Sequence, residues 1–224
     1  MMWPATEFTK LLLPAGMADP IVGGPLKRVF DLGVTLVAII LLSPLLAFLA
    51  ISLRVAQGGP ILVKHTRIGK GGVPFPCLKF RTMAVNADDI LRTHLAKDAA
   101  ALQEWKSSRK LRYDPRVTAL GHVLRTTSLD ELPQLFNIIR GEMSLVGPRP
   151  IVEQEIDMYG DAMEHYLVAR PGLTGLWQVN GRSDLSYASR VAFDIQYVRT
   201  WHFGLDLFIL FKTVAIVIRS KGSY

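Results

Sequence analysis

The sequence predicts a mainly helical α+β protein, in which one membrane-embedded helix precedes a polar domain that contains a short β-hairpin. Three observations predict this architecture. Residues 32–53 form a run of 22 positions without a charged side chain, which is long enough for a membrane helix. Two short apolar-rich stretches then flank a glycine-rich turn, as in a hairpin. The rest of the chain holds nearly all of the 26 basic and 19 acidic side chains.

The charge balance favours anionic partners. The formal net charge of +7 suits lipid headgroups, nucleotides, polyphosphates or nucleic acid. No recognition motif or aromatic stacking surface for nucleic acid is evident, so no nucleic-acid partner is expected. Cys77 is the sole cysteine, and no Cys or His cluster has metal-ligand spacing. A disulfide framework and a structural zinc site are therefore not expected.

Residues 1–26 contain four prolines and one short leucine patch, which predicts a loosely ordered or interfacial tail rather than a signal peptide. The membrane segment is expected over residues 27–57. As a helix, its uncharged run would measure about 33 Å, which is enough to cross a hydrocarbon core of about 30 Å. No small-residue cleavage site follows the run, so the segment should remain in the mature protein.

Two features bear on how this helix sits in the membrane. Ser43-Pro44 lies at its middle, and basic residues flank both of its ends. A helix that turns at Ser43-Pro44 and leaves on its side of entry would keep both flanks at one surface. The Ser43 hydroxyl or neighbouring helices would then have to satisfy the freed backbone carbonyls. From these residues alone, a proline-kinked spanning helix is the favoured alternative.

The elements that follow are predicted in chain order. Residues 61–65 and 73–80 form the hairpin around the turn at 69–72. The composition of residues 84–111 is typical of solvated amphipathic helices. Residues 204–219 are apolar with interspersed charges, which predicts an amphipathic helix at the membrane interface, with a buried core helix as a nearly equal alternative.

An acidic pair marks the candidate site. Ser128 and Glu131 have the spacing of a capping box, which places Asp130 and Glu131 in the first turn of a helix. Such acids usually only complement the helix dipole. Two arginines nearby favour a site instead: Arg125 precedes the pair, and Arg149 lies in a Pro-Arg-Pro loop after the helix. Two carboxylates facing two fixed cations can hold a divalent cation and a diphosphate while one carboxylate attacks phosphorus.

An ordered series of motifs extends through residues 27–224. The motifs are KRVFD (27–31), SP (43–44), KFRTM (79–83), TSLDELPQ (127–134), MSLVGPRP (143–150), RPGLTG (170–175) and GRS (181–183). Together they resemble the bacterial sugar transferases, the monotopic polyprenyl-phosphate phosphoglycosyl transferases that prime exopolysaccharide and glycan assembly. The first 26 residues lie outside the resemblance.

The resemblance implies a topology and a reaction. The membrane helix would be re-entrant and broken at Ser43-Pro44, so this topology now becomes the expected one. Residues 58–224 would form the catalytic domain at the cytoplasmic face of the bacterial inner membrane and end in the interfacial helix. Asp130 would attack the β-phosphate of a UDP-sugar and release UMP. Polyprenyl (undecaprenyl) phosphate would then take the phosphosugar from the enzyme.

The resemblance also assigns site residues. Mg²⁺ is the implied cofactor, with Glu131 as its ligand. The implied contacts to substrate phosphates are Arg125, Arg149, Lys79 and Asp194, and Arg28 would contact a lipid headgroup. For Lys79 and Asp194, membership of a structural ion pair is as well supported as a contact to substrate. UDP-glucose and UDP-galactose are the sugars expected by analogy with compact family members, and a homo-oligomer is compatible with the sequence.

Two other functions stay open. A bitopic membrane regulator or scaffold would use the acidic pair only as a helix cap, and loss of UMP release on Asp130→Asn would count against it. A transferase that displaces UMP directly would form no covalent intermediate. A phosphosugar adduct trapped without lipid acceptor would distinguish it from the two-step mechanism.

Overall fold

The computed structural model describes residues 22–108, 111–181 and 185–219. Most of the predicted tail (residues 1–21), Arg182 and Ser183 of the last motif, and residues 220–224 lie outside the described ranges. The predicted class is confirmed, because the described chain is mostly helical with a two-stranded hairpin and a long apolar helix near its start.

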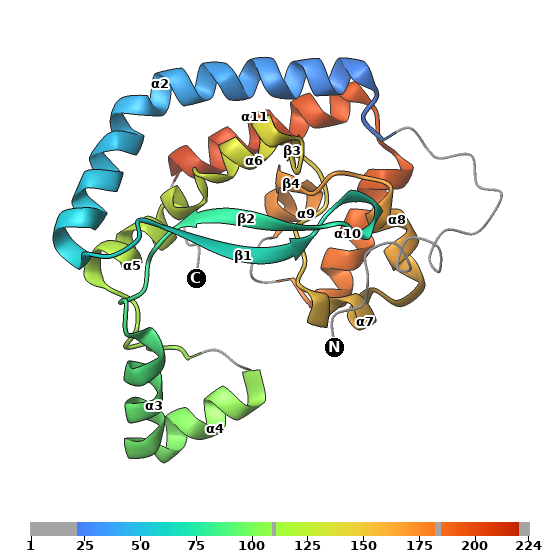
Figure 1. The fold of residues 1–224 in the computed structure, drawn as a ribbon. Helices are drawn as coiled ribbons and strands as arrows, with labels where there is room; N and C mark the ends of the chain where they lie inside the picture. Colours follow the sequence, from blue (N-terminus) through green and yellow to red (C-terminus); the bar gives the residue numbers. More distant parts are fainter. Residues whose placement is uncertain (1–21, 109–110, 182–184, 220–224) are drawn as a thin grey trace.

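The long apolar helix α2 spans Pro25–Gln57 and ends at Gly58, whose φ of 61° is in the left-handed region. Within the described ranges it is the one helix long and apolar enough to cross a membrane, and only 11% of its most apolar window is buried. The predicted break at Ser43-Pro44 is instead a bend inside a continuous helix (Figure 1). Pro44 lacks the N–H that would bond the Ile40 carbonyl, and the Ser43 hydroxyl donates to that carbonyl at 2.8 Å. Of the two partners expected for a freed carbonyl, the Ser43 hydroxyl is therefore the one present at Ile40.

The hairpin lies where the sequence placed it. Strand β1 (Leu62–Ile68) pairs antiparallel with β2 (Pro74–Phe80), and a 3-10 turn at Lys70–Gly72 joins them. β1 extends three residues beyond the predicted stretch. A second pair was not predicted: β3 (Ser144–Val146) lies parallel to β4 (Gly172–Thr174).

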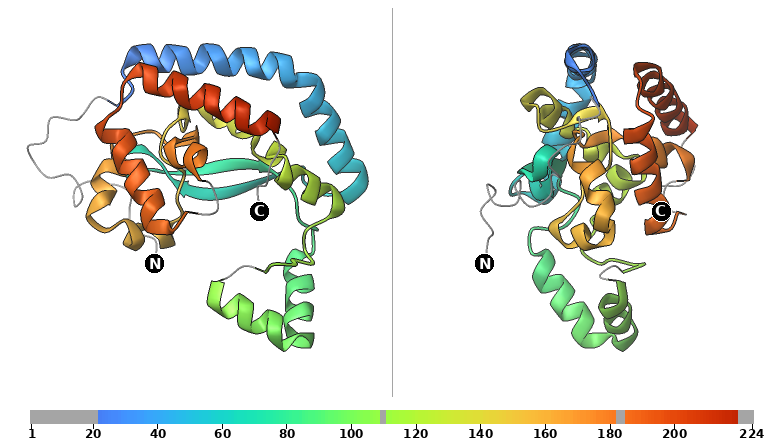
Figure 2. Two further views of the ribbon diagram at one scale, coloured as in Figure 1. Left: turned by 180° about the vertical axis from the view of Figure 1, so that it is seen from behind. Right: turned by 90° about the vertical axis from the view of Figure 1, so that its right-hand side faces the viewer.

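The remaining elements are mostly short helices. They are α3 (Ala87–Lys97), α4 (Ala99–Ser108), α5 (Ala119–Thr126), η2 (Leu129–Glu131), α6 (Gln134–Arg140), η3 (Glu153–Glu155), α7 (Ile156–Tyr159), η4 (Gly160–Ala162), α8 (Met163–Leu167), α9 (Leu176–Asn180), α10 (Tyr187–Arg199) and α11 (Phe203–Arg219). Helices α3 and α4 confirm the prediction for residues 84–111. They project from the body on the side opposite to α2 and α11 (Figures 1 and 2).

The C-terminal helix α11 has two kinds of surface. Ile209 is fully buried in the main core cluster, together with Ile138 of α6 and Tyr197 of α10. On its outer surface, Phe211 is 75% exposed and Phe208 is also exposed. One face therefore packs as a core helix does, and the other exposes apolar side chains. Helix α11 itself lies on the same side of the molecule as α2 (Figure 2).

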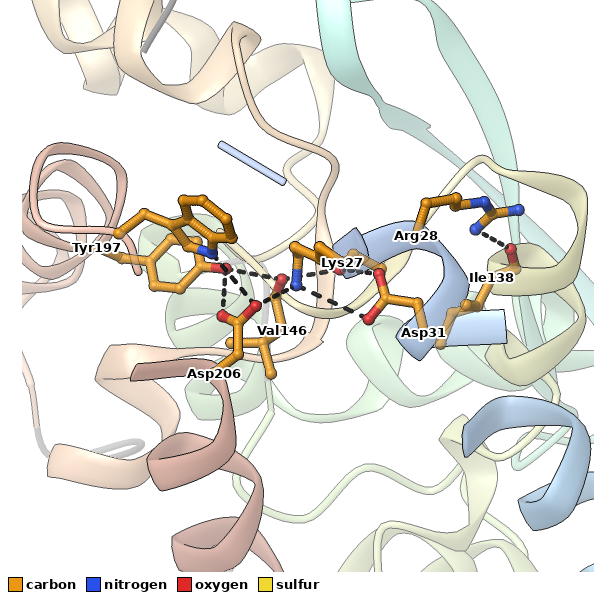
Figure 3. A network of polar contacts seen from close by, with 9 residues as sticks. Lys27, Arg28, Asp31, Ile138, Val146, Tyr197 and Asp206 are labelled. Atoms are coloured by element: carbon orange, nitrogen blue, oxygen red, sulfur yellow. Dashed lines mark hydrogen bonds and ion pairs between the residues drawn. The ribbon is translucent and has the colours of Figure 1, made fainter. Parts of the chain in front are cut away.

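A buried ionic network fixes the start of α2 to α11 (Figure 3). Lys27 Nζ lies 2.7 Å from Asp206 Oδ2 and 3.7 Å from Asp31 Oδ1. Asp206 also accepts bonds from the Tyr197 hydroxyl at 2.8 Å and the Trp201 indole N–H at 3.2 Å. The sequence assigned Lys27 to a basic flank and did not predict this network.

The capping box predicted at Ser128 is wrong. Ser128 has a φ of 58° and its side chain caps no helix. Its backbone N–H bonds the carbonyl of Arg125, so Ser128 ends α5 instead of starting the next helix. The 3-10 turn η2 follows, and α6 begins only after Pro133. Asp130 and Glu131 therefore belong to a tight connection between α5 and α6.

Candidate active site

A cavity of about 670 Å³ lies among β1, β2, the α5–η2 region, the loop after β3, and α9 and α11. Its charged or titratable lining side chains are His65, Arg67, Lys79, Arg125, Asp130, Glu131 and Arg149. All of these except Arg149 come from the hairpin, α5 and η2. The cavity brings together the acidic pair and three of the four residues expected at the substrate phosphates. The fourth, Asp194, does not line it.

The acidic pair is held in place through Asn137 of α6. Its side-chain oxygen accepts a bond from the Leu78 N–H at 3.0 Å, and its side-chain nitrogen donates to the Pro76 carbonyl at 2.8 Å. These bonds join α6 to the edge of β2. They hold η2, which immediately precedes α6, beside the end of that strand.

Lys79 of β2 bridges the two carboxylates. Its Nζ lies 2.6 Å from Glu131 Oε1 and 3.7 Å from Asp130 Oδ2. The ion pair that was the alternative for Lys79 is present, and it lies inside the cavity. The Lys79 ammonium thus offsets the repulsion between the two carboxylates. The same positive charge would attract an anionic ligand that approaches them.

The pKa values of the two carboxylates are shifted in opposite directions. Burial raises the pKa of Asp130 and the neighbouring Glu131 adds to this, although Lys79 and Arg125 oppose them. Burial would also raise the pKa of Glu131, but the charges of Lys79 and Arg149 outweigh it and lower that pKa. Two adjacent acids with pKa values shifted in opposite directions are typical of a site that divides roles between them.

Arg125 is positioned by a close approach of α5 to the chain after β2. A Cβ on Gly121 would lie 1.9 Å from the Thr82 carbonyl oxygen, so glycine is required there. The N–H of Gly121 bonds the Thr118 hydroxyl, which caps α5. One turn later, Arg125 Nε donates to the Thr82 hydroxyl at 2.9 Å. The remaining guanidinium donors are left for the cavity.

Arg149 is exposed in a loop whose two prolines are buried. Its guanidinium lies over the Trp177 ring at 5.5 Å, and that ring also contacts Arg190 at 4.9 Å. Asp194 of α10 accepts a bond from the Tyr159 hydroxyl at 2.7 Å and another from the Arg149 backbone N–H. Burial raises the pKa of Asp194 to about 7. Asp194 therefore supports the Arg149 loop from inside the fold.

Two further cavity residues, His65 and Arg67, were missed by sequence reasoning. They follow Val63 at every second position along β1, so the three side chains share one face of the strand. Val63 pairs with Lys79 of β2. Burial lowers the pKa of His65, and Arg67, Lys79 and Arg125 add to this, so the imidazole is neutral near pH 7. The period-two spacing opposite Lys79 was the signal available in the sequence.

The residues expected at the membrane lie away from the cavity lining. Ser43 and Pro44 form the bend of α2. Arg28 donates to the carbonyls of Ile138 at 2.7 Å and Ile139 at 3.1 Å, and so caps the C-terminal end of α6 (Figure 3). This contact joins α2 to the helix that follows the acidic pair.

The donor set suits Mg²⁺. Asp130 and Glu131 present carboxylate oxygens in one cavity. Protein magnesium sites use one or two carboxylates together with waters and substrate phosphates. No cluster of three or more His, Cys, Asp or Glu side chains occurs within residues 22–108, 111–181 and 185–219. The site therefore fits a metal ion that is bound together with a phosphate ligand.

The fold and the site together define an enzyme-like centre for phosphorylated ligands beside an apolar helix. Four fixed cations surround two carboxylates, one of them buried with a raised pKa. The sequence profile of the bacterial sugar transferases matches residues 22–220, and the chain belongs to that family. The resemblance is thereby confirmed, and the protein is an enzyme of this class.

Several curated proteins are similar over most of the chain. The exopolysaccharide production protein ExoY of Sinorhizobium fredii is 54% identical, over 91% of this chain and 90% of its own length. An undecaprenyl-phosphate galactose phosphotransferase of Salmonella typhimurium is 49% identical, over 89% of this chain and 42% of its own length. A UDP-galactose-lipid carrier transferase of Erwinia amylovora is 50% identical, with the same two coverages.

Proposed function

We propose that this protein transfers a sugar 1-phosphate from a UDP-sugar to polyprenyl phosphate, with Asp130 as the nucleophile. The observation that carries the proposal is the buried Asp130 carboxylate, held beside Glu131 and Lys79 in a cavity lined with cations. The relatives support this choice, since they include an undecaprenyl-phosphate galactose phosphotransferase and a UDP-galactose-lipid carrier transferase.

The proposed reaction has two steps. An Asp130 carboxylate oxygen attacks the β-phosphorus of the UDP-sugar, and the bond from that phosphorus to the oxygen bridging to the α-phosphate breaks. UMP leaves with the bridging oxygen, and a sugar phosphate remains as an acyl phosphate on Asp130. A phosphate oxygen of the polyprenyl phosphate then attacks the same phosphorus. The Asp130 carboxylate is released and a polyprenyl diphosphate sugar is formed.

The surrounding side chains make this attack feasible. Two anionic substrates approach an anionic nucleophile, so the site must offset their repulsion. Lys79, Arg125 and Arg149 supply fixed positive charge, and the planar guanidinium groups suit phosphate oxygens. Mg²⁺ held by Glu131 would add charge neutralisation at the diphosphate when bound.

UMP release is the assay for this mechanism. Purified Asp130→Asn should release no UMP from a UDP-sugar, because an amide is a poor nucleophile, while its melting temperature stays near wild type. Asp89→Asn is the matched control, since that carboxylate is exposed on α3. Appreciable UMP release by Asp130→Asn would refute the mechanism, and equal inactivity of all samples would favour a scaffold. A panel of UDP-sugars in the same assay identifies the donor.

Trapping tests the covalent step. Wild-type enzyme incubated with a sugar-labelled UDP-sugar and no lipid acceptor should acquire label that Asp130→Asn does not acquire. An active enzyme that acquires none would indicate direct displacement of UMP by the acceptor.

We also propose that α2 is re-entrant from the cytoplasmic side of the inner membrane. The supporting features are the bend, the Ser43 bond to Ile40 at its middle, and the basic residues at both ends. Single cysteines in the tail before Lys27 and in the turn 69–72, in a Cys77→Ser background, should both resist an impermeant thiol reagent on spheroplasts. Labelling of the tail cysteine alone would show that α2 spans the membrane.

A further inference from the structure

The cavity has a second wall, which the proposed chemistry at Asp130 does not use. Its lining from β4, α9 and α11 carries no charged side chain within the described residues. Five aliphatic residues of this lining are here named the apolar wall: Leu173, Val179, Leu210, Ile216 and Val217. The cavity is therefore two-sided, with charged groups on the hairpin side and aliphatic groups on the α11 side.

Three of the five residues of the apolar wall come from α11, and Leu173 of β4 and Val179 of α9 complete it. Leu210, Ile216 and Val217 follow helical spacing, and between them Thr213 donates to the Ile209 carbonyl and bonds the Thr174 hydroxyl at 2.7 Å. These bonds use the polar atoms of the two threonines within the protein. A ligand on this wall would therefore find mainly aliphatic contacts, with Trp177 and Gln178 of α9 as the other side chains on this side of the cavity.

The apolar wall reaches the protein surface. Val217 lines the cavity and is also 47% exposed near the end of α11. The neighbouring outer face of α11 exposes Phe208, Phe211 and Val214, and α11 lies on the same side of the molecule as α2 (Figures 1 and 2). A chain of hydrocarbon could thus pass from the cavity along α11 to an apolar surface, beside which the Lys212 ammonium lies over the Phe208 ring at 5.6 Å.

We infer that the apolar wall is the binding site for the first isoprene units of the acceptor, with its phosphate directed to Asp130. This inference rests on the proposed function. The sugar and uridine of the donor are rich in hydroxyl and carbonyl groups, which would lose hydrogen bonds against aliphatic side chains. An isoprenoid gains by burial there and carries its phosphate on the adjoining carbon. The apolar wall therefore selects the acceptor, while the cations bind phosphates of either substrate.

Short prenyl phosphates test the inference with the full-length enzyme. Geranyl, farnesyl and geranylgeranyl phosphate carry two, three and four isoprene units, and each is assayed at a saturating concentration of the UDP-sugar that gives the most UMP. With the wild-type enzyme, the acceptor KM should fall by about tenfold or more as the first isoprene contacts are added. The KM for the UDP-sugar is measured in parallel.

Two substitutions of Ile216 alter the wall. Ile216→Trp fills the space, so it should raise the acceptor KM roughly tenfold or more and flatten its dependence on chain length. Ile216→Ala removes a contact without adding bulk, and should raise that KM by several-fold, on the order of fivefold. Val85→Trp is the matched control, because it adds similar bulk at an exposed position that belongs neither to the cavity lining nor to α11. It should leave both KM values unchanged.

The outcomes are distinct. If Ile216→Trp and Ile216→Ala keep the wild-type acceptor KM and its dependence on chain length, the inference is wrong while the proposed function stands. If the KM for the UDP-sugar rises instead, the wall binds the donor and the inference is also wrong. If the wild-type enzyme transfers sugar phosphate to no prenyl phosphate, the proposed function itself fails. Melting temperatures of the variants show whether a higher acceptor KM comes from unfolding. If Ile216→Trp proves to be unfolded, the acceptor KM of Ile216→Ala tests the inference alone.

Discussion

Removing the carboxylate of Asp206 should destabilise the protein strongly. The side chain is 1% exposed, and it accepts bonds from Lys27, Tyr197 and Trp201. Breaking a buried ion pair by deleting one partner costs about 3–5 kcal/mol, because the remaining charge stays buried. Lys27 keeps Asp31 at 3.7 Å, and the Tyr197 hydroxyl can still donate to the Val146 carbonyl. We therefore expect Asp206→Ala to lower the free energy of unfolding by about 3 kcal/mol, at the low end of that range.

Reversible denaturation in detergent micelles measures this change. Asp89→Ala is the control, because its pair with Arg92 at 3.5 Å is largely exposed and should contribute about 0.5 kcal/mol or less. A triple variant, Lys27→Met with Asp31→Asn and Asp206→Leu, removes all three charges of the network and should recover much of the lost stability. If Asp206→Ala is no less stable than Asp89→Ala, the network is not a stabilising contact and the reasoning is wrong.

Three further predictions concern the cavity and its support. Arg149→Lys keeps the charge but loses the planar pair of donors and the stacking on Trp177, so kcat/KM for the UDP-sugar should fall roughly tenfold or more; near-normal kinetics would place Arg149 outside the site. Asp194→Asn keeps an acceptor for the Tyr159 hydroxyl, so melting curves should show it more stable than Asp194→Ala, which loses both bonds at about 1–3 kcal/mol. Burial raises the pKa of Asp130, and the attacking carboxylate must be ionised. UMP release should therefore fall with decreasing pH at a pH above the usual aspartate pKa of about 3.9. A rate of UMP release that stays constant down to about pH 3.9 would contradict this.

Local patterns in the sequence predicted most of the framework. The uncharged run gave α2, the glycine turn gave the hairpin, and the helical composition gave α3 and α4. Each of these signals is contained within a few neighbouring residues. The Ser43 bond to Ile40 followed from the missing N–H of Pro44, which is equally local.

The errors came from contacts that local patterns do not encode. Ser128 has the residue type of a helix cap, but its backbone turns left-handed to end α5, and this depends on how α5 packs on Thr82. The apolar residues Leu132, Leu135, Phe136 and Ile139 have the spacing of one helix face, yet Ile139 is exposed. The polar Asn137 is fully buried instead and bonds the edge of β2. Tertiary hydrogen bonding thus outweighed the apolar periodicity.

The candidate site was predicted in part for the same reason. Asp130, Glu131, Arg125 and Arg149 lie in or beside distinctive motifs, so the sequence alone was enough to predict them as site residues. His65 and Arg67 stand in an ordinary amphipathic strand, and only the pairing of β1 with β2 shows that they face the acids. Lys27 and Asp206 are 179 residues apart, and nothing in either neighbourhood indicates its partner.

That separation has a consequence for how the chain is made. At roughly 5–20 residues per second, a ribosome takes on the order of ten to forty seconds to add the 179 residues between Lys27 and Asp206. During this interval α2 has no partner from α11, and the Lys27 ammonium can remain hydrated. The buried network between the two helices is completed only when Asp206 has been added. The contact between α2 and α11 therefore forms only after almost the whole chain has been synthesised.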